Sequence, residues 1–118
     1  MTKHTFKIGN NRGRSRIWLD GKHLTDAGFV PGTKFIATSS AFNAHWNNTL
    51  VLHFSPVNPV TDDEELQIGQ QVRKVSGRPT GKPIIDIVGK TVSDLFPGAT
   101  HIDVEFGDCR IVIKRAAQ

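Results

Sequence analysis

Arginine and lysine side chains gather in two blocks of this chain, and each block leads into an apolar, β-branched run. The first block contains Lys7, Arg12, Arg14, Arg16 and Lys22, and the second contains Lys74, Arg78 and Lys82. Glycines lie among these residues, so the backbone can come close to an anion while the long side chains reach it. A guanidinium group also matches a phosphate group or the edge of guanine. The two blocks therefore predict contacts with nucleic acid, and the competing interpretation is a solvated face that keeps a small protein soluble.

The other residue types that could do chemistry lack the spacing that catalysis or metal binding needs. No two of the five histidines would share a helical face, and no cysteine cluster joins them. The carboxylates of Asp62–Glu65 are consecutive in a proline-bearing segment, which is typical of solvated charge rather than of a metal-dependent nuclease. Cys109 follows a turn and precedes an apolar run, a position that favours packing. We therefore expect no enzymatic activity, no cofactor and no metal.

The composition limits the class of protein. The chain has 118 residues, which suits one domain and is too short for two ordinary ones. A single cysteine excludes a disulfide within the chain. No apolar run is long enough to span a membrane, and the first ten residues lack the apolar region of a secretory signal, so we expect a cytoplasmic protein without a membrane partner. The net charge is +4, and the excess of positive charge lies in residues 1–34 and 73–90, which agrees with a nucleic-acid partner.

Two parts of the chain resemble each other in order. Residues 13–26 align with residues 81–94 at an offset of 68, and the Pro-Gly turns that follow align at an offset of 66. Upstream, Lys7-Ile8 matches Lys74-Val75 if one residue is gapped. We therefore interpret residues 1–118 as a single domain with repeat 1 at about 5–55, a linker at about 56–71 and repeat 2 at about 72–115.

Each repeat predicts the same order of elements: a strand, one helical turn, an extended stretch and a closing strand. The expected pairs of segments are 16–19 and 84–88, 23–27 and 91–95, 34–38 and 101–106, and 49–54 and 110–114. The loop at 39–48 carries Phe42 and Trp46, which would either stack on bases or a partner protein, or plug one end of the fold. The residues expected to form most of a shared core are Ile17, Leu19, Leu24, Phe29, Phe35, Leu50, Leu52, Ile85, Ile87, Val92, Phe96, Ile102, Val104, Phe106, Ile111 and Ile113.

Neither repeat can cover the apolar faces of its own strands, so we expect the two repeats to interleave. The predicted fold is mainly β with short helices, a small β-barrel formed as a single-chain pseudo-dimer of two ββαβ-type repeats. Such a pseudo-dimer would be a monomer or would pair as a homodimer.

The segment 17–32, IWLDGKHLTDAGFVPG, resembles the SymE-like branch of the SpoVT/AbrB swapped-hairpin superfamily. That branch shows an apolar strand, a glycine, an apolar residue and leucine, then Ala-Gly-Phe and a further glycine two residues on. His23 stands where an aromatic residue is usual, and Leu95-Phe96 replaces Ala-Gly-Phe in the second repeat. The two basic blocks are also similar to small segments attached to phage and plasmid cytosine methyltransferases. The chain lacks the Pro-Cys nucleophile motif and the cofactor-binding glycines of those enzymes.

The resemblance implies an AbrB-like barrel that binds DNA through basic residues on its first strands and the loops before them, as a transcriptional regulator or an antitoxin. On this interpretation Arg12, Arg14 and Arg16 would converge with Arg78 and Lys82 on one face. One alternative is a SymE-like toxin that acts on RNA. Another is a phage or mobile-element inhibitor that binds a protein of a host defence system, similar to an anti-CRISPR protein.

Overall fold

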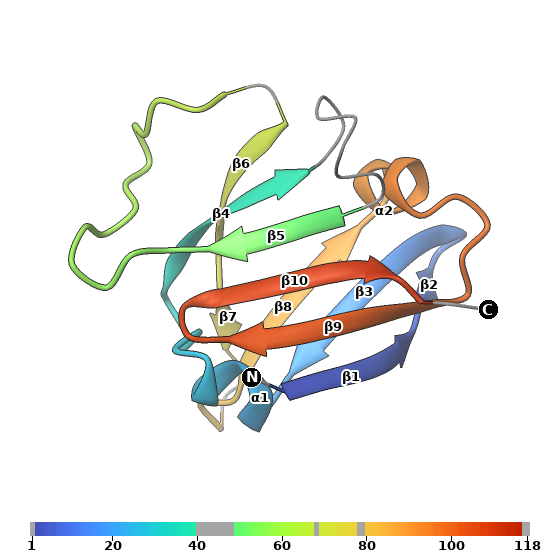
Figure 1. The fold of residues 1–118 in the computed structure, drawn as a ribbon, viewed down its shortest axis with the longest axis horizontal. Helices are drawn as coiled ribbons and strands as arrows, with labels where there is room; N and C mark the ends of the chain where they lie inside the picture. The colour runs from blue at the N-terminus through green and yellow to red at the C-terminus, as the bar shows by residue number, and fades with distance from the viewer. Residues whose placement is uncertain (1, 40–48, 68, 78–79, 117–118) are drawn as a thin grey trace.

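The computed structural model describes residues 2–39, 49–67, 69–77 and 80–116, so Phe42 and Trp46 lie outside the described residues. Within these ranges the fold is mainly β with two short helices, and its strands form two antiparallel sheets (Figure 1). The elements are β1 (Thr2–Lys7), β2 (Gly9–Asn11), β3 (Arg14–Asp20), α1 (Lys22–Asp26), β4 (Lys34–Ser39), β5 (Thr49–His53), β6 (Gln70–Lys74), β7 (Ser76–Gly77), β8 (Pro83–Val88), α2 (Lys90–Leu95), β9 (His101–Gly107) and β10 (Arg110–Arg115).

The two sheets lie face to face. One has six strands in the order β1-β9-β10-β5-β4-β6, and the other has four in the order β2-β3-β8-β7. In Figure 1, β1, β9, β10 and β5 form the front layer, and β3 and β8 cross behind them. The short helices cap the two ends of the β3–β8 pair, because each helix begins directly after one of these strands.

The described residues do not form the closed barrel expected from the sequence. The six-stranded sheet ends at β1 and β6, and the four-stranded sheet ends at β2 and β7. The chain changes sheets at Ile8 and at Val75, whose N–H groups donate to the carbonyl oxygens of Thr100 and Thr33, each at 2.8 Å. At these two residues the extended chain is divided into β1 and β2 in the first half, and into β6 and β7 in the second half. Each half therefore contributes strands to both sheets, but the two sheets are not joined into a closed barrel.

The order of elements in the first half, three strands, a helix and two strands, occurs again in the second half. The counterparts are β1 and β6, β2 and β7, β3 and β8, β4 and β9, and β5 and β10. Exchanging every strand for its counterpart reverses the strand order of each sheet and changes nothing else, as a two-fold relation between the halves requires. The register of β3 with β8 agrees with this two-fold relation. Trp18 pairs with Asp86, and Asp86 is the residue that corresponds to Trp18 at the offset of 68. The halves are interleaved: β1 pairs with β9, and β6 pairs with β4.

The core between the sheets contains all the apolar residues that the alternation predicted. Ile17 and Leu19 of β3 face inward, while the intervening Trp18 faces outward, as a half-buried strand requires. Four further residues that we did not predict complete the core: Ala27, Ala37, Val75 and Leu95.

The segment between β5 and β6, predicted to be a solvated linker, has two attachments to the fold. Val60 is buried, and Asp62 forms an ion pair with Lys34 at 3.0 Å. This segment loops out on the side of the molecule opposite to β2 and α2 (Figure 1). Neither helix in the described ranges has the length and apolar character needed to cross a membrane.

Candidate nucleic-acid interface

The β2–β3 hairpin presents Arg12 at its tip. Asn11 pairs with Arg14, which leaves a two-residue turn of Arg12 and Gly13 with φ of 56° and 81°. A turn with positive φ at both central residues suits the twist of a hairpin, and Asn-Gly is the preferred sequence for it. Asn10 Oδ1 supports the turn by accepting a hydrogen bond from the Gly13 N–H at 2.8 Å. Arginine is strained at such a position, and the Arg12 side chain is exposed.

Arg14, the first residue of β3, reaches across to the start of α2. A Cβ at position 89 would collide with the Arg14 guanidinium, so the group lies directly against the Gly89 backbone. The Gly89 N–H donates to the Ser15 carbonyl oxygen at 2.8 Å, which fixes the start of α2 beside β3. Lys90 follows Gly89 and is exposed. Arg12, Arg14 and Lys90 therefore form one positively charged group, which we call the hairpin cluster.

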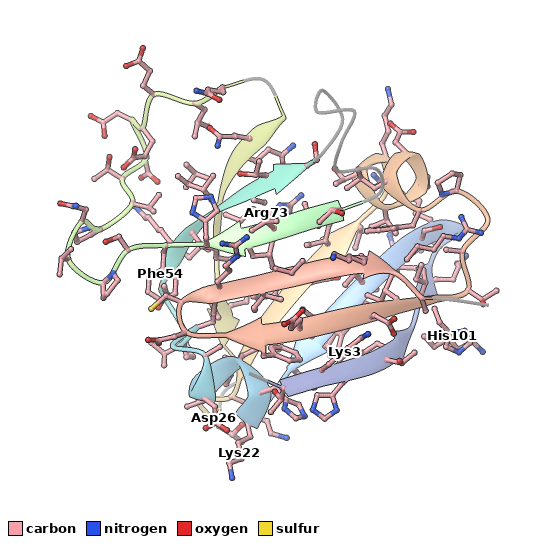
Figure 2. All side chains as sticks on the ribbon, viewed as in Figure 1. Lys3, Lys22, Asp26, Phe54, Arg73 and His101 are labelled. Atoms are coloured by element: carbon pink, nitrogen blue, oxygen red, sulfur yellow. The ribbon has the colours of Figure 1, made fainter. Side chains whose placement is uncertain are left out.

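The counterpart of this group lies at the other end of the same sheet. Lys82 approaches Gly21, with its Cε 3.9 Å from the place of a Cβ at residue 21, and Lys22 begins α1. Lys22 projects away from the sheets at the lower edge of Figure 2, and Asp26 extends from the same helix. Asp20 also lies at this end of β3, so the two carboxylates offset the charge of the two lysines. We call Lys22 and Lys82 the α1 cluster.

Arg16 lies between the two clusters and is engaged within the protein. Its Nε and Nη2 donate to the two carboxylate oxygens of Asp86 at 2.8 and 2.9 Å. Its guanidinium carbon lies 4.3 Å from the centroid of the Trp18 ring. The hydrogen bond with Asp86 raises the pKa of Arg16 above its ordinary value. Arg16 is therefore held flat on the outer face of the four-stranded sheet, where it tethers β3 to β8.

The described residues of the two basic blocks do not converge as we expected. β3 and β8 are antiparallel, so the residues before them lie at opposite ends of the pair. If the pairing of β3 with β8 is continued past Asp20 and Ile84, Lys82 lies opposite position 22. Position 22 is eight residues along the chain from Arg14, which corresponds to about 26 Å at roughly 3.3 Å per residue. Lys7 and Lys74 are exposed at the ends of β1 and β6. Arg78 lies outside the described residues.

Lys90 is the basic residue that our reasoning from the sequence missed. It lies at the offset of 68 from Lys22, and both residues follow a glycine at the start of a helix. The alignment of the two repeats would therefore have identified Lys90 as the counterpart of Lys22.

The other residue types weighed in the sequence were histidines, carboxylates and the single cysteine. No three His, Cys, Asp or Glu side chains there come together as metal ligands. Cys109 lies in the turn before β10, and partial burial and neighbouring Asp108 raise the pKa of its thiol. A raised pKa keeps the thiol protonated and poorly nucleophilic at neutral pH.

No family model, curated protein or solved structure matches this chain.

Proposed function

We propose that this protein is a non-enzymatic DNA-binding module of the swapped-hairpin, AbrB-like type, in which one chain supplies both halves of a pseudo-dimer. The interleaved pairing and the strand orders that read the same in both directions support this proposal. The resemblance assigns such a module to transcriptional regulators or antitoxins, and we carry that role over as part of the proposal.

The hairpin cluster is the observation that carries the proposal. None of its three side chains forms an ion pair with another described residue, whereas Arg16 is neutralised by Asp86. Arg12 occupies a turn position that favours asparagine or glycine, and it points its charge into solvent. Strain retained at an exposed, charged residue is typical of a functional position.

DNA would be held mainly through its phosphates. Three unpaired cations on a hairpin tip and an adjacent helix start can contact consecutive phosphates of one strand, and Lys7 and the α1 cluster would extend the contact. The spacing of about 26 Å between the clusters corresponds to about eight base pairs of duplex, at roughly 3.4 Å per base pair. The acidic run 62–65 belongs to the segment between β5 and β6, which loops out on the side opposite to β2 and α2 (Figure 1), so it would not repel a duplex bound at the hairpin cluster.

Fluorescence anisotropy with a labelled duplex of about twenty base pairs, at several salt concentrations, tests the proposal. With four to six phosphate contacts, the logarithm of the affinity should fall with the logarithm of salt at a slope of about −4 to −5. The double variant Arg12→Ala/Arg14→Ala should bind more weakly, with a slope shallower by about 2. The matched control is Arg110→Ala/Lys114→Ala, which removes two exposed cations from the six-stranded sheet and should change the slope little.

Three results would contradict the proposal. Equal losses in the two double variants would remove the hairpin cluster from the interface. Preference for a single-stranded RNA competitor over the duplex would favour the RNA-directed alternative. Absence of duplex binding at 50 mM salt, together with purification of a stoichiometric protein complex, would favour the inhibitor alternative.

A further inference from the structure

A small polar pocket opens between the two sheets, at the edge formed by β4, β6 and α2. It has a volume of about 130 Å³. Ser39, Gln71, Arg73 and Thr91 supply its polar lining, and Leu50 and Ile87 supply apolar contacts from the core side. This volume is well below the roughly 300 Å³ at which pockets begin to hold drug-sized ligands. Only a group of a few heavy atoms fits it.

The counterpart of this pocket, formed by β1, α1 and β9, is occupied by aromatic rings. When the pairing of β1 with β9 is matched to that of β6 with β4, the residues that correspond to Gln71, Arg73, Thr91 and Ser39 are His4, Phe6, His23 and Phe106. The ring centroids of His4 and His23 lie 4.1 Å apart, and those of His23 and Phe106 lie 5.1 Å apart. Phe6 also packs against the core.

Where the counterpart site has four aromatic rings, this pocket has an arginine, a glutamine and two hydroxyl-bearing residues, contributed by both halves of the chain. An arginine in a pocket of this size, beside neutral hydrogen-bonding groups, suits the recognition of a small charged ligand.

Arg73 supplies the charge of this pocket. It is half-buried, and no described residue forms a hydrogen bond or ion pair with its guanidinium group. Burial lowers the pKa of Arg73, and the electrostatic influence of Asp86 opposes that change less strongly. Asp86 already holds Arg16 at 2.8 Å, so its carboxylate is not available as a close partner. None of the described residues that line the pocket is acidic.

We propose that this pocket binds a single small oxyanion, a phosphoryl or a carboxylate group. The Arg73 guanidinium would form paired hydrogen bonds with two of its oxygens, a geometry that arginine provides and lysine does not. The hydroxyl of Thr91 and the amide of Gln71 would donate to the remaining oxygens, while the Ser39 hydroxyl already donates to the Gly69 carbonyl oxygen at 3.3 Å. The proposal does not depend on DNA binding, because Arg73 belongs to neither the hairpin cluster nor the α1 cluster (Figure 2).

Thermal unfolding with added inorganic phosphate, sulfate or acetate, at constant ionic strength in chloride, tests this site without any nucleic acid. The melting temperature of the wild-type protein should rise along a saturating curve, by about 4 °C at ten times the dissociation constant. A larger rise with phosphate and sulfate than with acetate would identify the phosphoryl-like ligand, and the reverse order would identify a carboxylate.

Two variants and a control decide the result. Arg73→Gln keeps the polarity of the site without its charge, and Arg73→Phe copies the residue at the counterpart position 6. Both should lose the rise, whereas Arg110→Gln, which removes an exposed arginine, should keep it. If Arg73→Phe does not fold, Arg73→Gln alone carries the test. An equal rise in Arg73→Gln and the wild-type protein, or no rise in the wild-type protein, would overturn the proposal.

Discussion

Arg12 shows how a single residue can be placed for its charge at the expense of local stability. It takes the left-handed backbone conformation in a two-residue turn, where asparagine would be favoured. The neighbouring Asn10 and Gly13 already satisfy the requirements of that turn. The arginine therefore adds only its exposed charge.

Replacing Arg12 with asparagine separates these two effects. Arg12→Asn should raise the free energy of unfolding by about 1 kcal/mol, because asparagine tolerates the left-handed conformation better. The same change should weaken duplex binding, because it removes a cation from the hairpin cluster. Urea unfolding and anisotropy on one preparation measure both quantities. A variant that is more stable and binds equally well would show that Arg12 does not contact DNA.

The short helices depend on the phenylalanine that follows each of them. α1 and α2 have five and six residues, too few to be stable alone. Phe29 and Phe96 come after these helices and are buried. Phe29 packs edge to face with Phe35 and Phe54 at centroid distances of 5.5 and 4.9 Å, so its environment is the more aromatic of the two.

Truncation of these two residues should cost different amounts. Phe96→Ala should reduce the free energy of unfolding by about 3–5 kcal/mol. Phe29→Ala should cost more, by about 0.5–1.5 kcal/mol for each aromatic pair that is lost. Chemical denaturation of the two variants under the same conditions measures the difference. A larger loss for Phe96→Ala would mean that the aromatic pairs around Phe29 add nothing to its packing.

The strands that could be predicted from the sequence are those with apolar, β-branched runs or an apolar alternation, namely β3, β4, β5, β8, β9 and β10. Both helical turns could also be predicted, because each lies between a glycine and a Pro-Gly pair. β1, β2, β6 and β7 were missed, because their side chains are mostly polar and exposed and leave no periodic signal. These strands form through backbone hydrogen bonds to partners in the other half or at a hairpin, which local sequence does not encode.

In the whole molecule, the internal repeat could be predicted from the sequence. That the two basic blocks lie at opposite ends of the β3–β8 pair could not be predicted. The offset of 68 located equivalent residues, while the antiparallel pairing of β3 with β8 decided that equivalent residues lie at opposite ends. Nor could the partner of Arg16 be predicted, because Asp86 is 70 positions away and meets it only across two strands. The sequence therefore indicated which residues are charged, and the sheet register determined which remain available.

The two halves have diverged in charge as well as in packing. The hairpin cluster has three cations, whereas Asp20 and Asp26 lie beside the α1 cluster. His4 and Phe6 pack with other rings at one site, whereas Arg73 and Gln71 line an open pocket at the other. A molecule with symmetric topology thus presents an asymmetric surface, and the hairpin end should dominate DNA binding.

The expectation that the hairpin cluster dominates DNA binding is tested by removing two cations from the hairpin cluster or from the α1 cluster and comparing the two variants. Arg14→Ala/Lys90→Ala and Lys22→Ala/Lys82→Ala each remove two cations, so their net charges are equal. Duplex affinity, measured by anisotropy at one salt concentration, should fall about tenfold or more for the first variant, because hydrogen bonds to charged groups are worth about 1.5–3 kcal/mol each. It should fall much less for the second. Equal losses of duplex affinity in the two variants, or a larger loss in the α1-cluster variant, would show that the hairpin cluster does not dominate DNA binding.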